Sequence, residues 1–229
     1  MKALRRILVM AEMHGRDLTR RHVALALLVA LPLSFYLTSG RHGSAALSAG
    51  GVGMAFAVSG ATLFSILSSA DVDQRLVLGG YQPLDLLLGR VLFLGPLGLV
   101  IAAAFSGLMA ALSHPQRPWV MALGVALVAL QSVPFGLAVG AALERELEGT
   151  LVLIGVVGIQ LAAELDSTVS KVLPFYGPRR LIASSLTRNG PIAGPAVQTA
   201  VYGVVLLLVA RLFVARRVDV RQHEATTAP

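Results

Sequence analysis

The sequence has no cysteine and few charged side chains. Charged residues make up 14% of its 229 residues, whereas ordinary soluble domains contain about 25%. The lack of cysteine excludes a disulfide framework, a thiolate metal site and a cysteine nucleophile. Hydrophobic residues make up 55% and the mean hydropathy is +0.75, which leaves too few polar side chains to cover a soluble protein of 23.9 kDa. The composition therefore indicates a protein that faces lipid.

Motifs for nucleotide and metal chemistry are also missing. No Gly-x-x-x-x-Gly-Lys-Ser/Thr sequence occurs, so the usual loop that binds nucleotide phosphates is absent. No His-Glu-x-x-His sequence occurs, and all five histidines fall in predicted tails, loops or span ends. The stretch Ala57-Val58-Ser59-Gly60 is similar to the Gly-x-Ser-Gly of intramembrane serine proteases, but no histidine lies within a span to activate the hydroxyl. We expect no enzymatic activity and no cofactor or metal on this chain.

Long apolar runs are the main positive signal. About 20 helical residues, at about 1.5 Å each, cross a hydrocarbon core of about 30 Å. Six runs approach this length, and they predict an all-α membrane protein in which residues 1–229 form one transmembrane domain. The predicted spans are 23–39, 45–69, 91–112, 119–143, 149–166 and 192–215.

The fifth run differs from the others because only residues 149–163 are uncharged. About 15 helical residues reach only about 22 Å. Either Glu164 and Asp166 lie in the membrane against protein, or residues 171–186 complete the crossing as a re-entrant outer segment buried against other helices. The prolines and glycine of the string Leu173-Pro174-Phe175-Tyr176-Gly177-Pro178 favour the second alternative.

The distribution of Lys and Arg predicts the orientation. With the N-terminus inside, the inner segments hold 13 of the 19 basic residues and the outer segments hold 6. This excess predicts a multi-pass protein of the plasma (inner) membrane with both termini in the cytoplasm. The net charge of +7 could also suggest nucleic acid. However, the arginines are divided between both membrane faces, where topology and lipid headgroups explain them, so we expect lipid contacts and no nucleic-acid partner.

The two ends of the chain are predicted to differ. Glu12, Arg16 and Asp17 interrupt the N-terminal apolar stretch, so no secretory signal peptide is expected. Apolar residues in this stretch instead follow helical spacing, which predicts an amphipathic helix along the inner interface, with a solvated basic tail as the alternative. Residues 219–229 are polar and are expected to form a disordered cytoplasmic tail.

The inner loop between the second and third runs has an unusual pattern. Charged residues open it at Asp71, an apolar patch follows at residues 76–78, Gly79 and Gly80 break the patch, and Pro83 begins a new helix. This pattern predicts a short helix across the cytoplasmic end of two spans. Such a helix can press into a groove of a partner, whereas a solvated connector would not need apolar residues there.

These features together resemble the permease subunits of ABC-2 type ABC exporters. The resemblance rests on the six runs, the amphipathic N-terminal segment and the pattern Arg75, Leu78, Pro83, Leu88-Gly89-Arg90 around a coupling helix. Residues 144–150 resemble the acidic turn that precedes the fifth span in that family, and residues 164–190 resemble its re-entrant region. The similarity covers nearly the whole chain through short motifs in the same order.

The resemblance implies a transport subunit driven by other chains. ATP and Mg would bind a separate cytoplasmic ABC ATPase, and a second permease would complete a homodimer or a heterodimer. The residues implied to couple to the ATPase are Asp73, Arg75, Leu78, Tyr81, Pro83, Glu144 and Glu146. The residues implied to face the translocation pathway are Phe56, Ser59, Leu63, Val157, Gln160 and Glu164.

Several alternatives stay open at this point. The pathway residues are mostly apolar or small, which suits an amphipathic small molecule, peptide or lipid-like substrate. Ser59, Thr62 and Gln160 could instead serve helix packing, and Glu164 could be a solvated cap beside Lys171. The chain could also be a membrane anchor or accessory subunit of an enzyme or sensor complex, because its extramembrane parts are small.

Overall fold

The computed structural model describes residues 2–40, 43–143 and 145–227, with the side chains of residues 2–3, 17–18 and 217–227 left out. In these residues the chain forms α-helices and no strand, which confirms the predicted all-α fold. The helices are α1 (Lys2–Arg20), α2 (His22–Thr38), α3 (Ser44–Ser68), α4 (Ala70–Leu78), α5 (Pro83–Ser113), α6 (Pro118–Ala142), α7 (Glu146–Ala162), α8 (Thr168–Val172), α9 (Tyr176–Ser184) and α10 (Ala193–Thr227).

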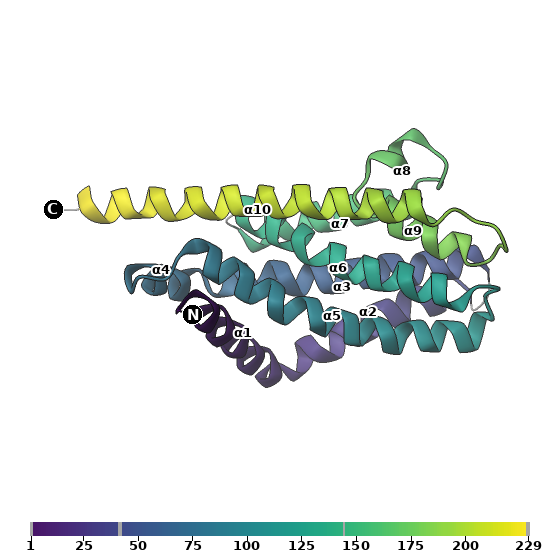
Figure 1. Cartoon of the computed structure of the whole chain (residues 1–229), viewed down its shortest axis with the longest axis horizontal. Helices are drawn as coiled ribbons and strands as arrows, with labels where there is room; N and C mark the ends of the chain where they lie inside the picture. The colour runs from purple at the N-terminus through teal and green to yellow at the C-terminus, as the bar shows by residue number, and fades with distance from the viewer. Residues whose placement is uncertain (1, 41–42, 144, 228–229) are drawn as a thin grey trace.

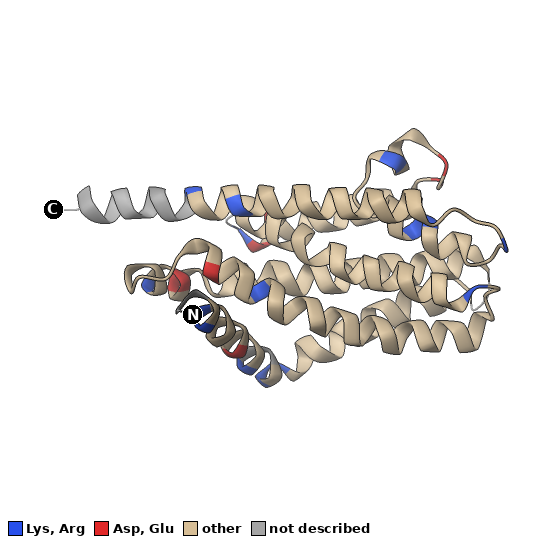
Figure 2. Ribbon diagram, in the orientation of Figure 1, with Lys and Arg blue, Asp and Glu red and all other residues tan. Residues whose placement is uncertain are grey.

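Four of these helices are long and apolar enough to cross a membrane, namely α3, α5, α6 and α10. Helices also form at the other two predicted spans, but α2 and α7 have only 17 residues each, about 26 Å of helix. Lys, Arg, Asp and Glu gather toward the two ends of the bundle, and the middle is almost free of them (Figure 2). Apolar helices with charges at their ends indicate a membrane protein.

Helices α3 and α6 form the centre of the bundle and approach each other closely (Figure 1). A methyl group added at Gly136 of α6 would collide with the main-chain oxygen of Ser59 on α3. At Gly140 and Gly149 an added methyl group would instead contact Leu63 of α3. Small residues therefore let the central helices pack backbone against side chain, as membrane helices commonly do.

The two ends of the bundle carry different elements (Figure 1). The beginning of α1 and the end of α10 lie at one end, together with α4 and the start of α5, and we call this the terminal end. The other end, with α8 and α9, is the distal end. Helix α1 lies oblique to the bundle and crosses α5 at Gly89, where an added methyl carbon would lie 2.5 Å from the Cβ of Met10. The absence of a side chain at Gly89 allows this crossing.

Helix α5 begins at Pro83, as the sequence predicts, and Gln82 and Asp85 form a capping box around that proline. Two other boundaries differ from the predicted ones. Helix α7 ends at Ala162, so Glu164 and Asp166 lie beyond it. Residues 219–227, predicted to be disordered, continue α10, because neither glycine nor proline interrupts the sequence after Gly203 until residue 229.

The segment after α7 folds back onto the bundle. Helix α9 packs against α3, α6 and α10 and buries Leu181 and Ile182 completely. Ile182 lies against Gly51 of α3 and Gly124 of α6. Arg117, before α6, donates two hydrogen bonds of 3.0 Å to the main-chain oxygens of Ser184 and Gly190. Helix α9 and the turn that follows it to Gly190 are therefore held against the helical bundle.

Candidate functional site

Helix α4 forms the candidate site at the terminal end, and its sequence explains its short length. Asp71 and Asp73 lie in its first turn, where the positive end of the helix dipole favours carboxylates. Its last turn is closed by hydrogen bonds from Gly79 and Gly80 to main-chain oxygens of the helix. Gly80 has a φ of +90°, a conformation that glycine adopts at little cost. The chain then turns at once into α5.

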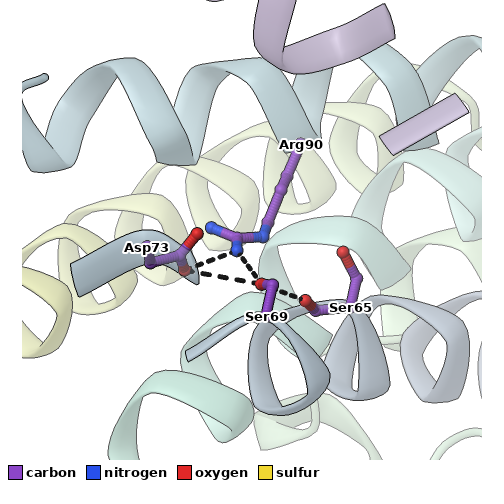
Figure 3. Close-up of polar contacts among 4 residues, drawn as sticks. All are labelled: Ser65, Ser69, Asp73 and Arg90. Carbon is purple, nitrogen blue, oxygen red and sulfur yellow. Dashed lines mark hydrogen bonds and ion pairs between the residues drawn. The ribbon is translucent and has the colours of Figure 1, made fainter. Parts of the chain in front are cut away.

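A buried polar network connects α4 to α3 and α5 (Figure 3). Nη2 of Arg90 donates to Oδ2 of Asp73 at 2.6 Å and to the Ser69 hydroxyl, which donates to the main-chain oxygen of Ser65 at 2.7 Å. The Arg90 side chain is only 2% exposed, so Asp73 supplies the negative charge that its burial requires. The network therefore fixes the position of α4 against two long helices.

Arg6 of α1 binds the turn between α4 and α5. Its Nη1 donates to the main-chain oxygen of Gly80 at 2.9 Å and lies 3.8 Å from Oδ2 of Asp85. Its guanidinium carbon also lies 5.4 Å from the ring centroid of Tyr81, within cation–π range. Four helices, α1, α3, α4 and α5, therefore meet in one structural unit.

The predicted coupling residues divide into internal and exposed groups. Asp73 and Tyr81 make the internal contacts described above, and Pro83 is half-buried in the first turn of α5. Arg75 is exposed, and Leu78 is 71% exposed at the end of α4. Glu146 is exposed in the first turn of α7, beside the equally exposed Leu147, whereas Glu144 lies outside the described residues. Arg75 and Leu78 of α4, and Glu146 and Leu147 of α7, are thus exposed at the terminal end, where a partner could contact them.

The predicted pathway residues of α3 lie mainly inside the single chain. Ser59 is fully buried, and its hydroxyl donates to the main-chain oxygen of Ala55 at 2.5 Å. Leu63 is fully buried against the glycines of α6 and α7. Only Phe56 is partly exposed, where it lines a small cavity. The structure thus places Ser59 and Leu63 in helix–helix contacts.

The predicted pathway residues of α7 have three different environments. Val157 is buried on the face of α7 that lies against the bundle. Gln160 is 1% exposed, and neither polar atom of its side chain has a hydrogen-bond partner within the described chain. Glu164 is exposed beyond the helix and makes no ion pair among the described residues, Lys171 included. The structure therefore does not bring the six predicted pathway residues to one surface.

Arg179 of α9 is a buried cation that sequence reasoning missed. Its side chain donates to the main-chain oxygen of Gln160, in the last turn of α7, where the helix dipole favours a positive charge. It is 5% exposed. No carboxylate within the described chain pairs with it, whereas its neighbour Arg180 binds Asp166 at 2.7 Å. The main-chain oxygen of Gln160 in the last turn of α7 is therefore its partner in the described chain.

Comparisons with known proteins do not assign the chain to a family. No protein-family model matches the sequence, and no curated protein matches it. Within the described chain, no three His, Cys, Asp or Glu side chains lie together as a metal site requires. The functional argument therefore rests on the arrangement of the helices and on the surface at the terminal end.

Proposed function

We propose that the chain is the membrane-spanning permease subunit of an ABC exporter. In this proposal α2, α3, α5, α6, α7 and α10 cross the plasma (inner) membrane, and the terminal end faces the cytoplasm. Helix α2, with 17 residues, lies at the lower limit for a transmembrane helix, whereas α7 carries Glu146 and Glu148 in its first turn and is apolar only after them. In this proposal the segment after α7 completes the fifth crossing. Helices α8 and α9 form the re-entrant outer segment.

The proposal rests mainly on the attachment of α4 to α3 and α5. Its outward surface presents Arg75 and Leu78, while its inner side is fixed to α3 and α5 through Arg90, Asp73 and Ser69. Exposed leucine beside exposed arginine suits contact with another protein. A movement imposed on such a helix passes directly to two long helices instead of being absorbed by a flexible loop.

The proposed mechanism needs no covalent chemistry on this chain. A separate ABC ATPase binds ATP and Mg, and its closure pushes α4 and the start of α7. Because α4 is fixed to α3 and α5, these helices move as rigid bodies between two arrangements. A second permease, identical or different, completes the path, and an amphipathic substrate crosses it.

Co-purification with the ATPase tests the proposal. Leu78→Asp places a charge on the exposed end of α4 and should reduce recovery of the ATPase at least tenfold. The matched control is Val172→Asp, which adds the same charge at an exposed apolar position of the distal end. Recovery of the control should equal that of the unaltered chain. Failure of any ABC ATPase to associate would contradict the proposal and favour a membrane anchor or accessory subunit.

A further inference from the structure

A cavity of about 560 Å³ lies at the terminal end, between α1, α3, α4 and α5. Its volume falls within the range of small-molecule sites, about 300–1,000 Å³. One part of its wall is apolar, with Met10, Phe64 and Phe93. Another part is polar, with carboxylates, hydroxyls and an arginine, namely Asp73, Glu146, Ser65, Ser68, Ser69 and Arg21.

A second cavity of about 130 Å³ continues from the first toward the middle of the bundle. The two cavities share Ala24 of α2 and Ala61 and Phe64 of α3 in their walls. The second is lined almost entirely by apolar residues of α2, α3 and α7, including Leu28, Phe56 and Leu153.

Three helices show the same change in polarity along the two cavities. Along α2 the lining runs from Arg21, the residue before the helix, in the first cavity to Leu31 in the second. On α3 it runs from Ser68 to Phe56, and on α7 it begins at Glu146 and ends at Leu153. The two cavities thus form one amphipathic groove, with its polar end at the terminal end of the bundle.

The polar end of the groove carries two carboxylates, those of Asp73 and Glu146. Asp73 faces it while bound to the buried Arg90. Glu146 also faces it and makes no ion pair among the described residues. A ligand that brings an ammonium group would give Glu146 a charged hydrogen-bond partner.

We propose that this groove binds a phospholipid with a primary ammonium head group, such as phosphatidylethanolamine, from the leaflet at the terminal end. The ammonium lies at Glu146, and the acyl chain follows the apolar cavity past Gly60. The apolar part of this site includes Phe56, one of the predicted pathway residues. The site requires a membrane protein but does not depend on an ATPase partner.

Native mass spectrometry of the purified chain tests the site with three single-chain phospholipids of equal acyl length. Lysophosphatidylethanolamine has an N–H donor cation, the choline analogue has a cation without N–H donors, and the glycerol analogue has no cation. Because a hydrogen bond to a charged group contributes about 1.5–3 kcal/mol, the ethanolamine lipid should bind at least about tenfold more tightly than the others.

Two pairs of variants locate the binding. Glu146→Gln should weaken binding of the ethanolamine lipid at least about tenfold, whereas Glu148→Gln, in the same helical turn but outside the groove, should not change it. Gly60→Leu should block the apolar part, because Gly60 lines that cavity and a Cβ atom added there has no heavy atom within 4 Å. Gly107→Leu on α5 is its control, since it also enters open space away from the groove.

The outcomes separate a specific site from general lipid contact. Loss of binding confined to Glu146→Gln and Gly60→Leu supports the site. Equal affinity for the three lipids would overturn it, as would Gly60→Leu binding as well as Gly107→Leu.

Discussion

The two partners of the Arg90–Asp73 pair differ in burial, so removing one or the other should have a different cost in stability. Arg90 is almost fully buried, whereas Asp73 retains 21% exposure of its side chain. Asp73→Asn leaves the buried Arg90 cation without its carboxylate partner and should destabilise the chain by about 3 kcal/mol or more. Arg90→Met leaves a carboxylate that still reaches solvent, so its cost should be smaller. Denaturation in detergent micelles would measure both, and equal costs would contradict this account.

The double variant provides the control for that comparison. Asp73→Asn combined with Arg90→Met removes both charges, so it should be more stable than Asp73→Asn alone. A double variant whose cost equals the sum of the two single costs would show that the two side chains do not interact.

Arg179 offers a second test at the residue scale. Arg179→Met removes the cation at the carboxyl end of α7, a contact that contributes about 1–2 kcal/mol when partly buried. Hydrogen exchange in the last turn of α7 should therefore accelerate by about tenfold. Arg180→Met is the neighbouring control, because its ion pair with Asp166 is exposed and such pairs contribute less than about 1 kcal/mol. Similar exchange in both variants would contradict a capping role.

At the scale of elements, the glycines of α6 set the distance between the central helices. Gly136→Ala places a methyl group against the main-chain oxygen of Ser59, where no flexible side chain can move away. Overpacking of this kind typically costs about 1–3 kcal/mol. Gly107→Ala enters open space and should be neutral or slightly stabilising. The midpoint of thermal unfolding should be lower for Gly136→Ala than for Gly107→Ala. Equal midpoints would contradict close contact between α3 and α6.

The sequence predicted the positions of the helices much better than their contacts. Apolar runs predicted helices near all six expected spans, and Gly79-Gly80 followed by Pro83 predicted the break between α4 and α5. The partnership of Arg90 with Asp73 joins residues from two helices, and no local spacing indicates it. The same holds for Ser59, whose burial against α6 depends on how two distant helices cross.

The continuation of α10 and the position of Arg179 have different physical reasons. Residues 219–227 are polar, and polarity alone favoured disorder, but the absence of a helix breaker allows α10 to continue. Arg179 follows Pro178 in a segment that resembles an interfacial turn. Its burial arises only because α9 folds back onto the end of α7.

At the scale of the whole molecule, the lack of cysteine makes the topology directly measurable. Leu78→Cys lies at the terminal end and Val169→Cys at the distal end, and both positions are well exposed. A membrane-impermeant maleimide applied to intact cells should label Val169→Cys, and should label Leu78→Cys only after permeabilisation. Labelling of both from the same side would contradict the six-span orientation.

ATP turnover of the purified complex tests the central claim most directly. Arg75 is exposed on α4, so Arg75→Ala should change the turnover of the associated ATPase severalfold while the complex stays assembled. Arg188→Ala removes another exposed arginine, near the distal end, and should leave turnover unchanged. If Arg75→Ala and Arg188→Ala give the same turnover as the unaltered complex, α4 does not couple this chain to an ATPase.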